Sequence, residues 1–178
     1  MNIIGISAYY HDSAACLLQN GKIIIATQEE RFSRVKHDKS FPTNAIKYCL
    51  DHSGLDLDKI DAIAFYDNWF LKQKRCVDNS LNFGSKSIDS FLSASENFFN
   101  ERDFLSNLKD IFNCSNSSLK EKLYYVQHHY SHAASTYYCS PFKDSAVITI
   151  DGVGEYSTTT IGYGNNEKLT LLKSIDFP

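Results

Sequence analysis

Residues 146–175, AVITIDGVGEYSTTTIGYGNNEKLTLLKSI, repeat the plan of residues 2–28, NIIGISAYYHDSAACLLQNGKIIIATQ. Each stretch is typical of a short apolar strand, a loop, a strand of small residues, a tight turn and a further strand. Asn20-Gly21 is a strong hairpin signal in the first stretch, and residues 164–167 supply the turn of the second. The sequence therefore predicts a three-stranded meander that occurs twice, which indicates an internal duplication.

Alternating helices and strands follow the first meander. Pro42 stands where a helix begins and Gly54 where one ends. The apolar face of that helix is formed by Ala45, Ile46, Cys49 and Leu50. Strands are predicted at residues 61–65 and 123–127, so we expect a mixed five-stranded sheet with helices.

Residues 68–118 give the weakest signal. Apolar residues at helical spacing predict a helix that contains Phe104, Leu105, Leu108, Ile111 and Phe112. A second helix is predicted over residues 91–99, and residues 113–118 are predicted to break the helical pattern. The domains are then a first lobe, residues 1–140, and the opening meander of a second lobe, residues 141–178. Because that second lobe lacks its helices, we expect the chain to be part of a longer protein.

The bulk composition excludes several classes of protein. The formal net charge of −3 argues against a dedicated nucleic-acid binder. The five scattered cysteines contain no CxxC pair, which suits a reducing compartment better than a disulfide framework. No window approaches the roughly 20 apolar residues of a membrane span. The expected location is the cytoplasm.

The histidine-rich stretch at residues 126–132, VQHHYSH, is a candidate metal site. His128 and His132 stand at i and i+4, so on a helix their rings share one face. Asp151, which ends an apolar strand, can supply a carboxylate as a third ligand. His129 points away from that face and needs a separate explanation. The alternative is a helix start where these histidines cap or pack.

The polar segment at residues 29–39, EERFSRVKHDK, has two interpretations. A run with both signs of charge is by default a solvated loop. Its basic side chains can instead bind a phosphate or another acidic group; the candidates are Arg31, Arg34, Lys36 and His37.

The duplicated meander resembles the plan of the actin, hexokinase and Hsp70-type ATPases. In those folds the turns after the first strand of each lobe face each other across a nucleotide cleft. Here these turns would be Ser7–Ser13 and Asp151–Ser157. The fold class suggested is an actin-like (ribonuclease H-like) α/β lobe. Gly152, Val153 and Gly154 are then candidates for backbone contacts to phosphate, with ordinary turn glycines as the alternative.

Four motifs in order resemble the N-terminal part of the carbamoyltransferase family, which includes nodulation-factor and antibiotic O-carbamoyltransferases. They are YHDSAA at residues 10–15, EERFSR with Lys36-His37, HHYSHAAS at residues 128–135, and IDGVGE at residues 150–155. The family is similar to the tRNA threonylcarbamoyl transferases in its two-lobed domain. The resemblance covers nearly the whole chain and is weakest over residues 68–118.

The resemblance implies a reaction and its partners. A YrdC-like domain would make carbamoyl-adenylate from carbamoyl phosphate and ATP, and the two-lobed domain would move the carbamoyl group to a hydroxyl of a small molecule. His128, His132 and Asp151 would bind a divalent metal such as iron, zinc or manganese, with a further aspartate from the missing second lobe. His11 would be catalytic, as a general base or an orienting group, together with Asp12; the alternative for Asp12 is a turn-closing side chain.

Two other functions compete with O-carbamoyl transfer. A threonylcarbamoyl transferase acting on tRNA is disfavoured by the net charge of −3 and by the segment at residues 29–37. A non-catalytic metal- or nucleotide-binding lobe would suit a chain that acts as a partner subunit. Neither composition nor motifs distinguish a monomer from a homodimer.

Overall fold

A computed structural model describes residues 1–89, 91–92 and 101–177 of the chain. The chain divides into two compact units, which are described separately below. Unit 1 comprises residues 1–66 and 99–125, and unit 2 comprises residues 67–98 and 126–178. No helix in the described part of the chain is both long and apolar enough to cross a membrane.

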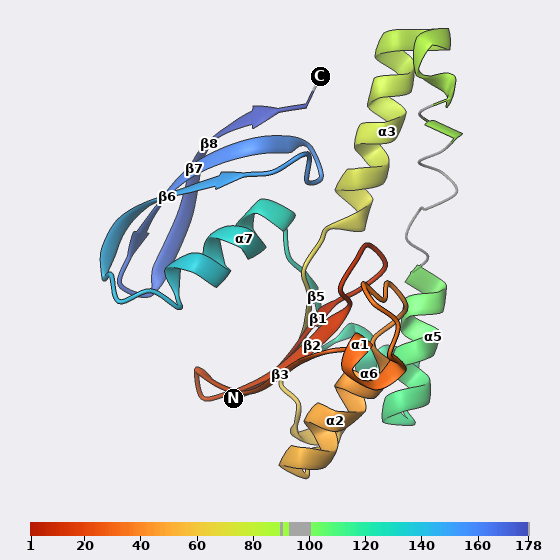
Figure 1. Cartoon of the computed structure of the whole chain (residues 1–178), viewed down its shortest axis with the longest axis vertical. Coiled ribbons are helices and arrows are strands. Elements are labelled where there is room, and N and C mark those ends of the chain that lie inside the picture. The colour runs from red at the N-terminus through yellow and green to blue at the C-terminus, as the bar shows by residue number, and fades with distance from the viewer. Residues whose placement is uncertain (90, 93–100, 178) are drawn as a thin grey trace. The chain divides into compact units, whose positions relative to one another are not determined.

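Unit 1 is built on a mixed five-stranded sheet with the strand order β3-β2-β1-β4-β5 (Figure 1). Its strands are β1 (Asn2–Ser7), β2 (Ala14–Gln19), β3 (Lys22–Gln28), β4 (Ala62–Phe65) and β5 (Leu123–Tyr125). Strand β2 pairs antiparallel with both β1 and β3, which forms the first meander. Strands β1, β4 and β5 run parallel to one another. The predicted mixed sheet and its first meander are confirmed.

The β2–β3 turn has the conformation that its residues favour. Asn20 and Gly21 both adopt positive φ angles, 50° and 77°. Two such residues in succession are typical of the type I′ hairpin turn, whose twist matches that of the strands it joins.

Helices cover the sheet of unit 1 with the faces that their periodicity predicts. Helix α2 (Thr43–Ser53) buries Ala45, Ile46, Cys49 and Leu50, and it ends at Gly54 with a φ of 64°. Helix α5 (Glu101–Phe112) buries Phe104, Leu105 and Leu108. The centroid of the Phe104 ring lies 5.0 Å from the ring centroid of Phe65 on β4 and 5.7 Å from that of Phe41. These rings contribute to a core with Ile4, Ile6, Leu17 and Ile63.

The interpretation of residues 29–39 as a solvated loop is wrong at its first residue. The Glu29 side chain is buried and accepts hydrogen bonds from the backbone N–H of Ala45 (2.8 Å) and from the Asn44 side chain (2.6 Å). The Ala45 N–H is one of the backbone donors at the start of α2 that a helix leaves without intrahelical partners. A short helix, α1 (Glu30–Ser33), follows.

The remaining helices were predicted poorly. Helix α3 (Trp69–Phe83) and the short α6 (Asn116–Lys120) were not foreseen; the predicted break is present at residues 113–115, and α6 begins within its predicted range. Two 3₁₀ turns, η1 (Leu57–Lys59) and η2 (Gly84–Ser87), are also present. The helix predicted over residues 91–99 falls almost entirely outside the described residues.

Unit 2 repeats the meander as an antiparallel sheet in the order β6-β7-β8. Its strands are β6 (Asp144–Ile150), β7 (Ser157–Asn165) and β8 (Lys168–Asp176). Helix α7 (His128–Tyr137) packs on one face, with Ala133 and Tyr137 against Val147 and Leu169 (Figure 1). The second meander and the histidine helix are therefore confirmed. The actin-like assignment and the lobe boundaries at residues 140 and 141 stay predictions.

Candidate metal centre and catalytic loop

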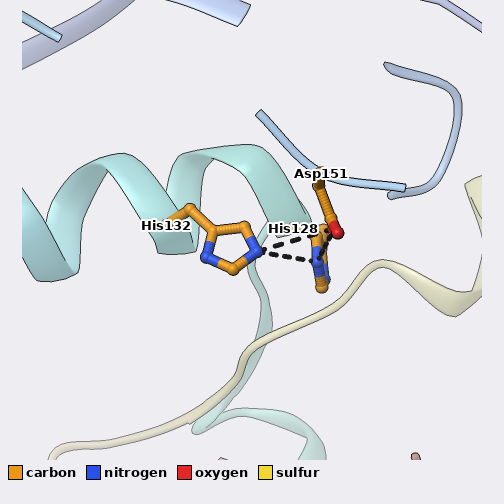
Figure 2. A group of neighbouring side chains, drawn as sticks. All are labelled: His128, His132 and Asp151. Carbon is orange, nitrogen blue, oxygen red and sulfur yellow. Dashed lines mark hydrogen bonds and ion pairs between the residues drawn. The ribbon is translucent and has the colours of Figure 1, made fainter. Parts of the chain in front are cut away.

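Helix α7 and the loop after β6 bring His128, His132 and Asp151 together (Figure 2). The Nε2 atom of His128 lies 2.8 Å from Oδ2 of Asp151 and 3.0 Å from Nε2 of His132. The third side of this histidine–aspartate triangle, from His132 Nε2 to Asp151 Oδ2, is 3.6 Å. The i, i+4 spacing accounts for the two rings on one face. The packing of α7 on the sheet brings in the carboxylate.

The triangle has the dimensions that a divalent metal requires. Zinc ligands lie about 2.0–2.2 Å from the ion, so tetrahedral ligand atoms are about 3.4 Å apart. The three separations, 2.8, 3.0 and 3.6 Å, fall around that distance. Without a metal, one Nε2–H of His128 would have to serve both Asp151 and His132. A divalent cation would bind all three atoms, so the donor set fits a metal better than hydrogen bonds alone.

The ionisation of the triangle agrees with this assignment. Burial and the neighbouring His128 lower the pKa of His132, although Asp151 acts against them. Burial acts to raise the pKa of Asp151, but hydrogen bonds from the Gly152 N–H and His128 outweigh it, so the pKa is lowered. A neutral imidazole and an ionised carboxylate are the forms that bind metals.

Glu155 anchors the start of the histidine helix, and its role was not predicted although it ends the IDGVGE motif. Its buried carboxylate accepts hydrogen bonds from the backbone N–H of His128 (2.7 Å) and of Asn68 (2.9 Å). Asn68 caps α3, so one carboxylate joins the first turns of α3 and α7. Burial raises the pKa of Glu155, and the carboxylate of Asp67 adds to this effect, while the two backbone donors oppose it.

His129 has a structural role. Its ring is buried, with Nε2 2.7 Å from the carbonyl oxygen of Ser157 and Nδ1 2.6 Å from the hydroxyl of Thr149. The carbonyl can only accept, so Nε2 carries the proton and Nδ1 accepts from Thr149. Thr149 in turn lies 2.7 Å from the Thr160 hydroxyl. This chain of hydrogen bonds fastens α7 to β6 and β7.

The two glycines of the 151–156 loop differ in what surrounds them. A Cβ atom on Gly154 would lie 2.9 Å from Cδ2 of His129 and 3.2 Å from Cβ of His128, whereas one on Gly152 would meet nothing within 4 Å. The N–H of Gly154 donates to Ser157, and that of Gly152 donates to its neighbour Asp151. Gly154 is therefore required for the close approach of the loop to α7.

This difference predicts opposite outcomes for two matched substitutions. Gly154→Ala should displace the loop or His128 and destabilise unit 2 by about 1–3 kcal/mol, the usual cost of overpacking. Gly152→Ala should change stability by less than about 0.5 kcal/mol, as exposed substitutions do. Thermal unfolding and hydrogen exchange over residues 126–137 would measure both. Equal effects of the two alanines would contradict the steric assignment.

In unit 1, the loop after β1 brings three of the predicted residues together. Asp12 lies between two histidines, with Oδ2 2.8 Å from Nδ1 of His11 and Oδ1 2.9 Å from Nδ1 of His37. Glu30 accepts a hydrogen bond from the backbone N–H of His37 at 3.0 Å. Asp12 and Glu30 each contribute a carboxylate oxygen and His37 a ring nitrogen, and these three atoms lie within 4.8 Å of one another. The contact between Asp12 and His37 was not predicted.

The basic candidates of this segment stay exposed. Arg34 and Lys36 are both exposed, and Arg31 forms an ion pair of 3.6 Å with Glu30. Their role in phosphate binding stays a prediction. The loop that bears His11 belongs to unit 1 and the histidine–aspartate triangle to unit 2.

Comparison with known proteins agrees with the four motifs. Residues 2–178 match the family described as carbamoyltransferase N-terminus. The chain is 42% identical to the uncharacterized protein sll1178 of Synechocystis sp., over 99% of this chain and 29% of that protein. It is 31% identical to the nodulation protein NolNO of Sinorhizobium fredii, over 93% of this chain and 23% of that protein. The chain thus spans less than a third of the length of these two relatives, and it belongs to the carbamoyltransferase N-terminus family.

Proposed function

We propose that this chain is the N-terminal part of an ATP-dependent O-carbamoyltransferase. The enzyme would form carbamoyl-adenylate from carbamoyl phosphate and ATP and transfer the carbamoyl group to a hydroxyl of a small molecule. The observation that carries the proposal is the histidine–aspartate triangle in a chain of this family. The relatives' greater length leaves room for a second lobe with a further aspartate ligand and for a YrdC-like domain.

His128, His132 and Asp151 would hold the metal in this enzyme. Bound there, a divalent ion such as iron, zinc or manganese would offset the negative charge of the adenylate and polarise its carbonyl group. His129, Glu155 and Gly154 hold the helix and the loop that carry these ligands. The protein thereby presents three ligand atoms in advance of binding.

Proton transfer belongs to the loop of unit 1 in this proposal. His11 would take the proton from the acceptor hydroxyl. As the acceptor oxygen bonds to the carbamoyl carbon, the bond from that carbon to the phosphate oxygen breaks and AMP leaves with the electron pair. Arg34 and Lys36 are exposed cations that could bind the phosphate. In the 151–156 loop the N–H groups of Gly152 and Gly154 already have acceptors, which favours Val153 for a backbone contact to phosphate.

Two further observations support a two-lobed, actin-like architecture. Each unit contains one antiparallel meander, and each meander has its candidate residues in the loop after its first strand. The face of the β6–β8 sheet turned away from α7 is apolar and exposed; it includes Ile148, Ile150, Ile161, Tyr163 and Ile175. An apolar sheet face is normally covered, so we propose that a further part of the protein packs on it. The composition suits a cytoplasmic enzyme.

The proposal is tested by the formation of AMP. The complete protein, supplied with ATP, carbamoyl phosphate and Mn²⁺ or Zn²⁺, should release AMP at a rate that depends on carbamoyl phosphate, with water in place of the acceptor hydroxyl. Reactions without carbamoyl phosphate and reactions with a chelator serve as controls. If no AMP forms with manganese, zinc or iron, the adenylate mechanism is wrong.

A further inference from the structure

Asp12 is the centre of a three-residue chain in unit 1. Its two carboxylate oxygens each face the Nδ1 atom of a different histidine, His11 at 2.8 Å and His37 at 2.9 Å. Both histidines are mostly exposed, with 62% and 61% of their side-chain surface accessible, while Asp12 is 31% accessible. The carboxylate thus lies between two exposed rings and is itself partly exposed.

The backbone around this chain is held in an unusual conformation. Tyr9, Asp12 and His37 have positive φ angles of 72°, 52° and 56°, a region that non-glycine residues seldom adopt. Hydrogen bonds join the two segments, from Tyr9 N to Lys39 O (3.0 Å) and from Ser13 N to Asp38 O (2.8 Å). Such strain persists only where the surroundings enforce it, and it is frequent at functional sites. The segment around His37 therefore fastens the loop that carries His11.

The hydrogen bonds determine which ring nitrogens carry protons. An ionised carboxylate can only accept, so the Nδ1 atoms of His11 and His37 must both be donors. A neutral His11 in this arrangement has its lone pair on Nε2. A carboxylate that orients a histidine in this way is a recurrent device in proton-transfer sites.

We propose that Asp12 and His37 are positioning residues for His11. Asp12 holds His11 as the Nδ1–H tautomer with Nε2 available as the proton acceptor, and His37 holds Asp12 in place. His37 is in turn held by Glu30, which accepts its backbone N–H. The positioning rests on the geometry alone, whereas the transfer of the acceptor's proton to Nε2 rests on the proposed function. His37 thereby gains a role other than phosphate binding.

The charges of the pair are consistent with this assignment. The hydrogen bond to Asp12 and the charges of Asp12 and Glu30 raise the pKa of His37. The hydrogen bonds from His37 and His11 lower the pKa of Asp12. The charged His37–Asp12 pair is therefore present above the ordinary pKa of an aspartate. It is lost as the pH rises through the raised pKa of His37. Arg31, bound to Glu30, is a further charge near the pair.

Diethyl pyrocarbonate tests the proposal, because it acylates only an imidazole nitrogen that carries a lone pair. Modification of the complete protein at neutral pH would be followed by peptide mass spectrometry at His11 and, as an exposed reference, at His52. Asp12→Asn should slow modification of His11 by about threefold or more, since its NH₂ group replaces one of the two acceptor oxygens, and a ring that faces this NH₂ must accept at Nδ1 and carry its proton on Nε2. His37→Ala should slow it by a smaller factor. His37→Gln, which can still donate to Asp12, should restore the wild-type rate.

Three outcomes would overturn the positioning role: an unchanged His11 rate in Asp12→Asn, an unchanged rate in His37→Ala, or equally slow His37→Ala and His37→Gln variants. The His52 rate, with circular dichroism, reports general unfolding. A pH series at His37 gives a second readout, because its half-reactive pH should fall in Asp12→Asn as the carboxylate is lost. The modification experiment needs neither a carbamoyl acceptor nor a nucleotide, so it does not depend on the proposed function. A failed AMP assay with the expected His11 rates would therefore refute the proposed function but not the positioning, and the reverse result would refute only the positioning.

Discussion

Replacing His132 with alanine should lower the affinity of the complete protein for zinc by at least about a hundredfold, because loss even of a residue that only supports a ligand costs about 10–100-fold. His132 is 51% accessible and packs little, so the substitution removes a ligand without opening the core. Zinc content after equilibration at a fixed free zinc concentration would measure the change. Carbamoyl transfer should fall with it.

The control for this substitution is His52→Ala, an exposed histidine on α2 in unit 1. It should leave zinc content and the unfolding temperature unchanged. Full zinc content in His132→Ala would exclude the histidine–aspartate triangle as the metal site. A loss of zinc in both variants would show that the metal binds elsewhere or nonspecifically.

Replacing Glu155 with alanine should expose the start of α7. Two backbone N–H groups, of His128 and Asn68, would lose their common acceptor. An unsatisfied buried donor costs about 1–3 kcal/mol, so the loss of an acceptor for two donors should make local opening of the first turns of α3 and α7 easier by about 2–6 kcal/mol. Hydrogen exchange of peptides that cover residues 126–137 should accelerate by more than about tenfold. Zinc affinity should fall as well, because His128 is the first residue of α7.

Glu155→Gln is the matched control, because its amide oxygen can accept the same hydrogen bonds. Burial raises the pKa of Glu155, so the ionised carboxylate is disfavoured in the folded state as the pH rises above the ordinary pKa of a glutamate. At neutral pH the glutamine variant should therefore be as stable as the wild type or more so. Equal exchange in Glu155→Ala and wild type would show that Glu155 does not anchor α7.

Patterns local in the sequence predicted much of the fold. The alternation of short apolar runs and turn residues predicted both meanders, because strand and turn preferences act over a few neighbouring residues. The apolar face of α2 and the ring pair His128 and His132 follow from helical spacing alone. Helix α3 escaped prediction: although it begins with Trp69 and Phe70, the chain around it is rich in polar residues, and none of its side chains is fully buried.

Contacts between distant residues were beyond the reach of these patterns. In the sequence Glu29 is one charged residue in a polar run. In the structure it is buried and binds Asn44 and Ala45 at the start of α2, which are fifteen and sixteen positions further along the chain. The pairing of Asp12 with His37 and of Glu155 with Asn68 spans 25 and 87 positions. No periodicity links such residues, because the packing of whole elements brings them together.

The sequence by itself determined the family, the two meanders and the residue types of the candidate metal site, because motif order, turn chemistry and helical spacing depend on residues that are close together in the chain. The tertiary structure decided which of those residues support the others. In the folded chain His129 fastens α7 to the sheet, and Glu155 binds the first backbone N–H of that helix. Asp12 contacts both His11 and His37. The physical reason is that a hydrogen bond requires its two atoms within about 3 Å, and for residues far apart in the sequence only the folded chain sets that distance.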